Sequence, residues 1–75
     1  MATVKQAIGE IDVVAFLKPV DKVDGDGQWP AGTLGTVVHD LGEMKMVEIS
    51  DDQGRALDFP VVPADRLKLV SDHSH

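Results

Sequence analysis

The chain is only 75 residues long and contains no cysteine. A domain of this size buries about 60% of the surface that its unfolded chain exposes, so its core is marginal. Domains this small usually gain stability from disulfides, a bound metal or association with another subunit. The lack of cysteine excludes disulfides, zinc fingers, iron–sulfur clusters and thiol nucleophiles. Association with another polypeptide is therefore the expected source of additional stability.

The charge balance limits the classes of partner. Thirteen Asp and Glu residues against seven Lys and Arg give a net charge of −6, which repels phosphate backbones, so we expect no nucleic-acid partner. The acidity suits solubility or a basic protein partner. No run of 18 apolar residues is present, and residues 1–10 lack the basic end and apolar stretch of a signal peptide. We therefore expect no membrane partner and a cytoplasmic location.

Turn-forming residues divide the chain into short runs of β-branched and apolar residues. These runs predict five strands at residues 12–18, 34–40, 44–50, 55–62 and 67–70. Pro60 cannot donate to a strand ladder, so the fourth strand is either an edge strand or broken there. Residues 51–54 predict a tight hairpin turn, and residues 63–66 suit a single helical turn.

The remaining segments are predicted to be irregular. Residues 19–32 are rich in Gly, Asp and Pro and predict a long loop. The strand of residues 34–40 is entered through Gly32 and Gly35, which allow a tight bend or a close backbone approach. Residues 1–10 form a short arm or helical turn, and residues 71–75 a frayed polar tail. The prediction is one all-β domain over residues 11–70, a small five-stranded partly open SH3-like barrel with a short helical turn before the last strand.

The first strand is apolar on both faces. Because side chains alternate along a strand, either Val13, Ala15 and Leu17 or Val14 and Phe16 lie outside a small barrel. The outer set must be covered by the N-terminal segment or by another subunit. The sequence leaves open which set it is.

Trp29 is the single tryptophan and lies in the long loop. It is either an interface anchor or a side chain that folds back to cap the barrel. A calcium loop beginning at Asp24 fails, because Trp29 would stand where such loops need glycine. A weaker cation contact by Asp21, Asp24 and Asp26 stays possible beside the alternative of a solvated turn.

No catalytic or metal-binding constellation is visible. His39 is the one histidine inside the predicted fold, and no Ser or carboxylate has a spacing that assigns it to His39. His73 and His75 alternate at the C-terminus, where they could chelate adventitious metal or form a plain tail. We expect no enzymatic activity, no cofactor and no resident metal.

Five blocks of sequence occur in a familiar order. They are residues 10–18 (EIDVVAFLK), 30–39 (PAGTLGTVVH), 47–49 (VEI), 51–55 (DDQGR) and 63–67 (PADRL). Together they resemble the bacterial family called domain of unknown function 4926, over roughly residues 10 to 70. The resemblance implies a fold similar to the SH3-like barrel of the smaller nitrile hydratase subunit, which does no chemistry itself, and it brings no catalytic residues.

The chain departs from that family before the third-strand Val-Glu pair, where Met44-Lys-Met46 replaces the usual aromatic. Methionine is adaptable and often lines contact surfaces. The resemblance also implies mobile or defensive gene clusters in which two small genes lie side by side.

Two functional hypotheses follow. The first is a non-enzymatic interaction module that self-associates as a dimer or tetramer. Its interaction surface comprises Val14, Phe16, Trp29, Met44, Met46 and Val61. The alternative is an accessory or antitoxin-like subunit that uses its acidic surface and the Trp29 loop to hold a larger, more basic partner protein; a second small protein is also a possible partner.

Overall fold

The computed structural model describes residues 8–71, and this part of the chain is all-β apart from one 3-10 turn. The elements are β1 (Val13–Phe16), β2 (Val20–Asp21), β3 (Gln28–Trp29), β4 (Leu34–Asp40), β5 (Met44–Ser50), β6 (Ala56–Asp58), β7 (Val61–Pro63), η1 (Ala64–Arg66) and β8 (Leu67–Ser71).

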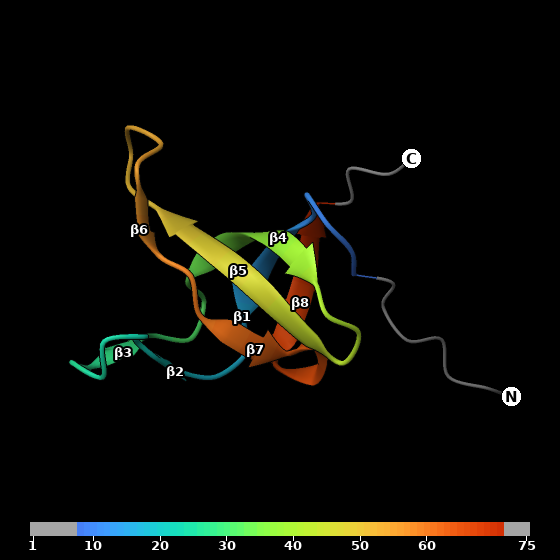
Figure 1. Ribbon diagram of the computed structural model, residues 1–75, viewed down its shortest axis with the longest axis horizontal. Coiled ribbons are helices and arrows are strands. Elements are labelled where there is room, and N and C mark those ends of the chain that lie inside the picture. Colours follow the sequence, from blue (N-terminus) through green and yellow to red (C-terminus); the bar gives the residue numbers. More distant parts are fainter. Residues whose placement is uncertain (1–7, 72–75) are drawn as a thin grey trace, which may run out of the picture.

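Six of the strands form one antiparallel sheet, shown in Figure 1. The strand order is β6-β5-β4-β1-β8, and β7 also pairs with β5. β2 and β3 form a separate two-stranded sheet, which we call the β2–β3 ribbon and define as residues 20–29. Within residues 8–71 no strand pairing closes the larger sheet into a barrel, so what the structure shows is a small antiparallel all-β fold.

The core lies on the inward face of the larger sheet. Alternation places Val14 and Phe16 of β1 inward, together with Val47 and Ile49 of β5. Burying a side chain of this kind contributes about 1.5–3 kcal/mol. The buried apolar residues are Ile8, Val14, Phe16, Val37, Val47, Ile49, Val62 and Leu67.

Gly35 allows β4 to approach β5 closely. A Cβ atom at this position would lie 2.4 Å from Val47 Cγ1 and 2.9 Å from the Glu48 carbonyl oxygen. Real Cβ contacts are not this short, so any other residue would push the two central strands apart. The predicted close backbone approach is therefore confirmed at Gly35.

The predicted strands agree with the structure in the centre of the chain. β4 and β5 have the predicted bounds, and the predicted fourth strand is broken at Pro60 into β6 and β7. Pro63 precedes the 3-10 turn that the sequence predicts. The prediction for residues 19–32 is wrong in part, because this segment contains the β2–β3 ribbon and not a loop alone.

The ends of the chain are described only in part. The predicted arm covers residues 1–10, of which residues 1–7 lie outside the described part of the chain. Ile8 is buried, and residues 10–11 form a turn with no helix. Of the predicted tail, Ser71 belongs to β8, whereas His73 and His75 lie outside the described residues.

Candidate interaction surface

An apolar surface lies on the outward side of β5 and β7. In the ladder between these strands Met46 is paired with Val61, and Met44 with Pro63. The intervening residue Lys45 pairs with the buried Val62, so its neighbours point to the opposite side of the sheet. The register therefore brings three of the predicted interaction residues, Met44, Met46 and Val61, onto one face.

Phe59, in the segment between β6 and β7, extends this surface. The Ile49–Asp58 pair continues the register of the Met46–Val61 pair. In this register Phe59 lies opposite Glu48, on the outward side of the sheet. Phe59 is 45% exposed and Val61 44% exposed, so both side chains leave part of their apolar surface on the outside of the sheet. We call Met44, Met46, Phe59, Val61 and Pro63 the outward patch.

Two polar side chains lie next to the outward patch, one on β4 and one on β5. His39 pairs with Met46 and is exposed, whereas Glu48 pairs with Thr36 and is half-buried. In residues 8–71 His39 has no hydrogen-bonded Ser or carboxylate that would make it a catalytic base. The outward patch thus has His39 beside it on β4 and Glu48 on the same face of β5, opposite Phe59.

Val14 and Phe16 do not belong to this surface. Val14 is fully buried and Phe16 is 2% exposed, because both point into the core. The prediction that they contact another chain is therefore wrong. Of the two alternatives for the first strand, the structure places the other set outward: Val13 and Ala15 are half-buried and Leu17 is exposed.

Trp29 also lies apart from the outward patch. Its ring packs against the core beside Val20, and its Nε1 donates to Asp58 Oδ2 over 2.9 Å. The Lys22 ammonium lies 4.8 Å from the ring centroid, where a cation–π interaction is favourable. Trp29 therefore has the capping arrangement, and its indole N–H and one ring face are already engaged within the chain.

Asp58 is the partner that connects this segment to the sheet. Its Oδ2 accepts a second hydrogen bond, from the Val23 backbone N–H at 3.0 Å. Burial of the carboxyl opposes ionisation, but the hydrogen bonds and the nearby Lys22 charge outweigh it and hold the pKa of Asp58 below its ordinary value. Sequence analysis missed Asp58, because its two donors lie 29 and 35 residues away.

A shallow pocket of about 340 Å³ lies between the β2–β3 ribbon and β7. Its polar groups are the Arg66 guanidinium and an Asp21–Gln28 pair, in which Gln28 Nε2 donates to Asp21 Oδ1 over 2.8 Å. The lining residues are Pro19, Val20, Asp21, Gln28, Val61, Val62, Pro63 and Arg66.

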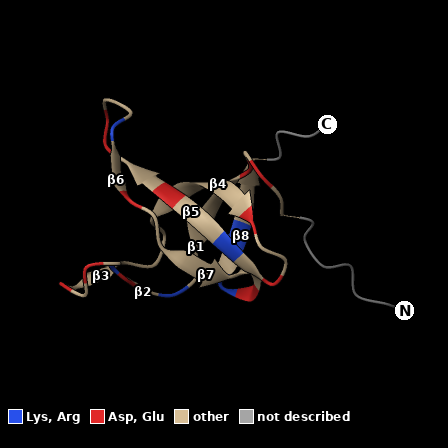
Figure 2. Cartoon of the chain, viewed as in Figure 1, with Lys and Arg blue, Asp and Glu red and all other residues tan. Residues whose placement is uncertain are grey.

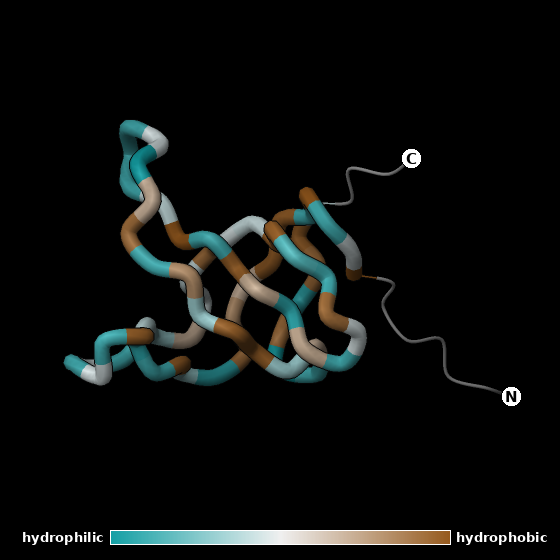
Figure 3. Tube along the Cα trace, in the orientation of Figure 1, coloured by the Kyte–Doolittle hydropathy of each residue, from teal (hydrophilic) through white to brown (hydrophobic). Residues whose placement is uncertain are grey.

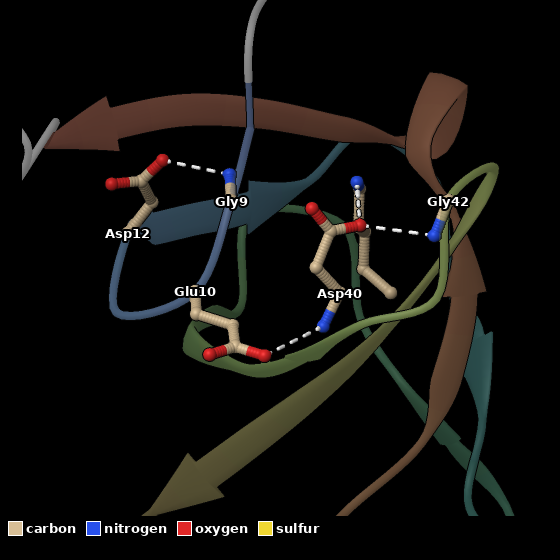
Figure 4. A network of polar contacts seen from close by, with 6 residues as sticks. Gly9, Glu10, Asp12, Asp40 and Gly42 are labelled. Atoms are coloured by element: carbon tan, nitrogen blue, oxygen red, sulfur yellow. Dashed lines mark hydrogen bonds and ion pairs between the residues drawn. The ribbon is translucent and has the colours of Figure 1, made fainter.

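A polar network occupies the side of the sheet where β4 turns into β5 (Figure 4). Lys45 is 6% exposed, and its ammonium donates to Asp40 Oδ1 over 2.5 Å. Gly42 N–H donates to the same oxygen, and these two donors hold the pKa of the Asp40 carboxyl below its ordinary value. The Asp40 N–H in turn donates to Glu10 over 3.5 Å. This network ties residues 8–12 to the sheet.

The same segment contains one strained residue. The turn of residues 9–12 is closed by a bond from the Asp12 N–H to the Gly9 carbonyl, and the Gly9 N–H donates to the Asp12 carboxylate. Ile11, the third residue of the turn, has a φ of 76°, a conformation that is uncommon for a β-branched side chain. Ile11 is held there by its N–H, which donates to the Val37 carbonyl over 2.7 Å.

In the described ranges, no group of three or more His, Asp or Glu side chains is arranged to hold a metal ion. The predicted cation contact by Asp21, Asp24 and Asp26 has no such geometry: Asp21 accepts from Gln28, and Asp24 Oδ1 accepts from the Asp26 N–H. None of the helical segments found in residues 8–71 has the length and apolar character needed to cross a membrane.

Comparison of the chain with protein-family models, with curated proteins and with solved structures gave no match. The resemblance to domain of unknown function 4926 therefore stays a prediction.

Proposed function

We propose that this protein is a non-enzymatic interaction module that forms a homo-oligomer through its outward patch. The observation that carries the proposal is the strand register, which places Met46 beside Val61 and Met44 beside Pro63 on the solvent side of β5 and β7. The partner is a second copy of this chain, and the simplest assembly is a two-fold dimer, in which the same patch contributes from both sides.

The balance of buried and exposed apolar residues supports self-association. In residues 8–71 eight apolar side chains are buried, whereas ten large ones are exposed, and hydrophobic residues are spread along this whole part of the chain (Figure 3). A domain with so small a core gains stability when exposed apolar area is covered by another subunit. Three of the ten exposed residues, Met44, Phe59 and Val61, lie in the outward patch.

The charge distribution also favours a second copy. Two chains of net charge −6 repel each other, so their contact must avoid the acidic segments. The five side chains of the outward patch are uncharged, and the charged neighbour on the same face is Glu48 of β5, which lies opposite Phe59. A stable dimer buries about 800 Å² on each partner, so the neighbouring outward residues Thr36 and Leu34 of β4 must contribute to the rim.

We also propose that the fold is the partly open SH3-like barrel of the domain of unknown function 4926 family. In support, the last strand β8 pairs with β1, and a 3-10 turn stands directly before it. The similar domain of the smaller nitrile hydratase subunit assists another polypeptide and performs no reaction itself.

A second candidate function is an accessory or antitoxin-like subunit for a basic protein. The observation that favours it is the position of Asp24, Asp26 and Asp52, exposed carboxylates on two hairpins that project from the same end of the molecule (Figure 2). A basic protein that co-purifies repeatedly from the native host would support this function. Repeated recovery of the chain without a partner would count against it.

A pair of matched variants tests self-association. Val61→Asp buries an unpaired carboxylate in the proposed interface, whereas Val70→Asp adds the same charge on β8, at the opposite end of the strand order. Val70 is 51% exposed, so both substitutions change a comparable surface residue. Molar mass is measured by light scattering between about 1 and 100 µM, a range that covers ordinary dimer affinities.

We expect the parent chain and Val70→Asp to show the mass of a dimer or tetramer at the upper concentrations. Val61→Asp should weaken the dimer about a hundredfold or more, because an unpaired buried charge costs about 3–5 kcal/mol. A parent chain that stays monomeric over the whole range would refute the proposal. Equal molar masses for the two variants would show that the interface lies on another surface.

A further inference from the structure

The β2–β3 ribbon is a separate small sheet beside the larger one. Its ladder consists of two residue pairs, Val20 with Trp29 and Asp21 with Gln28, and it does not join the hydrogen-bonded strand order of the larger sheet. A two-stranded hairpin of this length is at most marginally stable in water by itself. Its position therefore depends on contacts with the rest of the chain.

Two hydrogen bonds connect the ribbon to β6, and both end on one atom. Asp58 Oδ2 accepts from the Val23 N–H at 3.0 Å and from the Trp29 indole N–H at 2.9 Å. The ribbon also contributes Val20 and Trp29 to the edge of the core. Loss of the Asp58 carboxylate would leave the Trp29 N–H without its partner in a half-buried site, which disfavours the docked position.

Asp58 belongs to a strand that has little other support. β6 is three residues long, and it is the terminal strand on its side of the sheet. Its pairing with β5 is irregular, because the register shifts between Ile49 and Ser50. The next residue after Asp58 is Phe59, which points outward into the patch, whereas the Asp58 carboxylate faces the ribbon. Two consecutive residues thus have the two roles: Asp58 attaches the ribbon, and Phe59 forms one end of the proposed interface.

We propose that the β2–β3 ribbon is a flap held closed by Asp58, and that its closure fixes Phe59 in the outward patch and thereby strengthens self-association. This inference rests on the function proposed above. The flap turns at Pro19 on one side and at Pro30 to Gly32 on the other, where Gly32 has a φ of 89°. Opening removes Val20 and Trp29 from the core edge and releases β6 from the Trp29 and Val23 donors.

The coupling must act in both directions. If an open flap weakens the dimer, then dimer formation stabilises the closed flap by the same free energy. Trp29 is the single tryptophan of the chain, so its fluorescence reports the position of the flap without any label. Accessibility of the indole to acrylamide should therefore fall as the chain is concentrated and self-associates.

The test compares Asp58→Ala with Asp52→Ala. Each variant removes one carboxylate, so both change the net charge equally, but Asp52 is exposed at the tip of the β5–β6 turn. Asp58→Asn serves as the milder variant if Asp58→Ala fails to fold, because its amide oxygen can still accept hydrogen bonds in place of Oδ2 but carries no charge. Acrylamide quenching of Trp29 and the molar mass by light scattering are measured on the same samples, with circular dichroism as the check on folding.

We expect Asp58→Ala to raise quenching of Trp29 towards that of a free indole and to weaken the dimer about fivefold or more, the lower range of ordinary coupling. Asp58→Asn should give smaller changes in both measurements, and Asp52→Ala none. Unchanged quenching in folded Asp58→Ala would refute the flap. Raised quenching with an unchanged dimer would refute the coupling, whereas a monomeric parent chain would refute the proposed function, and the coupling with it.

Discussion

The two hairpins that project from one end of the molecule are held in different ways (Figure 1). The β5–β6 hairpin is closed by its own residues. Asp51 Oδ1 accepts from the Gln53 and Arg55 N–H groups, and Asp51 Oδ2 accepts from Arg55 Nε over 3.1 Å. The β2–β3 ribbon is attached instead through Asp58, which is remote in sequence. The first hairpin therefore depends on local sequence, and the second on the folded sheet.

The largest expected effect concerns Trp29, which joins the ribbon to the core. Trp29→Ala removes the packing of the half-buried ring together with one hydrogen bond to Asp58, and should lower the free energy of unfolding by about 3 kcal/mol. Urea unfolding followed by circular dichroism measures this loss. A change below about 1 kcal/mol would show that the ribbon contributes little to the stability of the sheet.

Acid should open the ribbon before it unfolds the sheet. The pKa of Asp58 is lowered in the folded state, so the stabilisation is fully present above its unfolded value of about 3.9 and is lost as the pH falls through the folded value. We expect quenching of Trp29 to rise in this acidic range, ahead of the circular dichroism change. Asp58→Asn lacks the titrating group and should not show the separate step. Coincident transitions in the parent chain would contradict the difference between the two hairpins.

The smallest effect is expected for Asp51→Ala. This substitution removes the local bonds of the β5–β6 turn, so the Gln53 and Arg55 amides should exchange faster with solvent. Because the site is exposed and local, the midpoint of thermal unfolding should move by less than about 4 °C. Quenching of Trp29 should not change. Release of Trp29 in this variant would show that the two hairpins are coupled after all.

The same contrast explains how much of the fold could be predicted. β4, β5, the turn of residues 51–54 and the break at Pro60 all follow from alternation and turn chemistry, which are local signals. The β2–β3 ribbon could not be found in this way, because its strands have two residues each and are fixed by Asp58. Propensity is too weak a signal for elements that short.

The candidate surface was predicted in part for a related reason. The sequence shows the apolar character of Met44, Met46 and Val61, but the face on which Val14 and Phe16 lie is decided by pairing with β4 and β8. The sequence does not identify Phe59, because the predicted strand of residues 55–62 has no clear inward and outward side. Lys45 was also missed, although a lysine in phase with Val47 and Ile49 is a signal for a buried cation.

Pro63 of β7 limits the kind of assembly that can form. Hydrogen-bonded pairs alternate along an antiparallel ladder, and Ala64 N–H donates to Glu43, so the nitrogen of Pro63 faces away from β5 and offers no hydrogen there. Growth of a continuous fibre by sheet extension needs two receptive edges on every molecule, and this edge is impaired. The protein can therefore form complexes with a fixed number of subunits through the faces of its sheet, while this edge resists open-ended polymerisation.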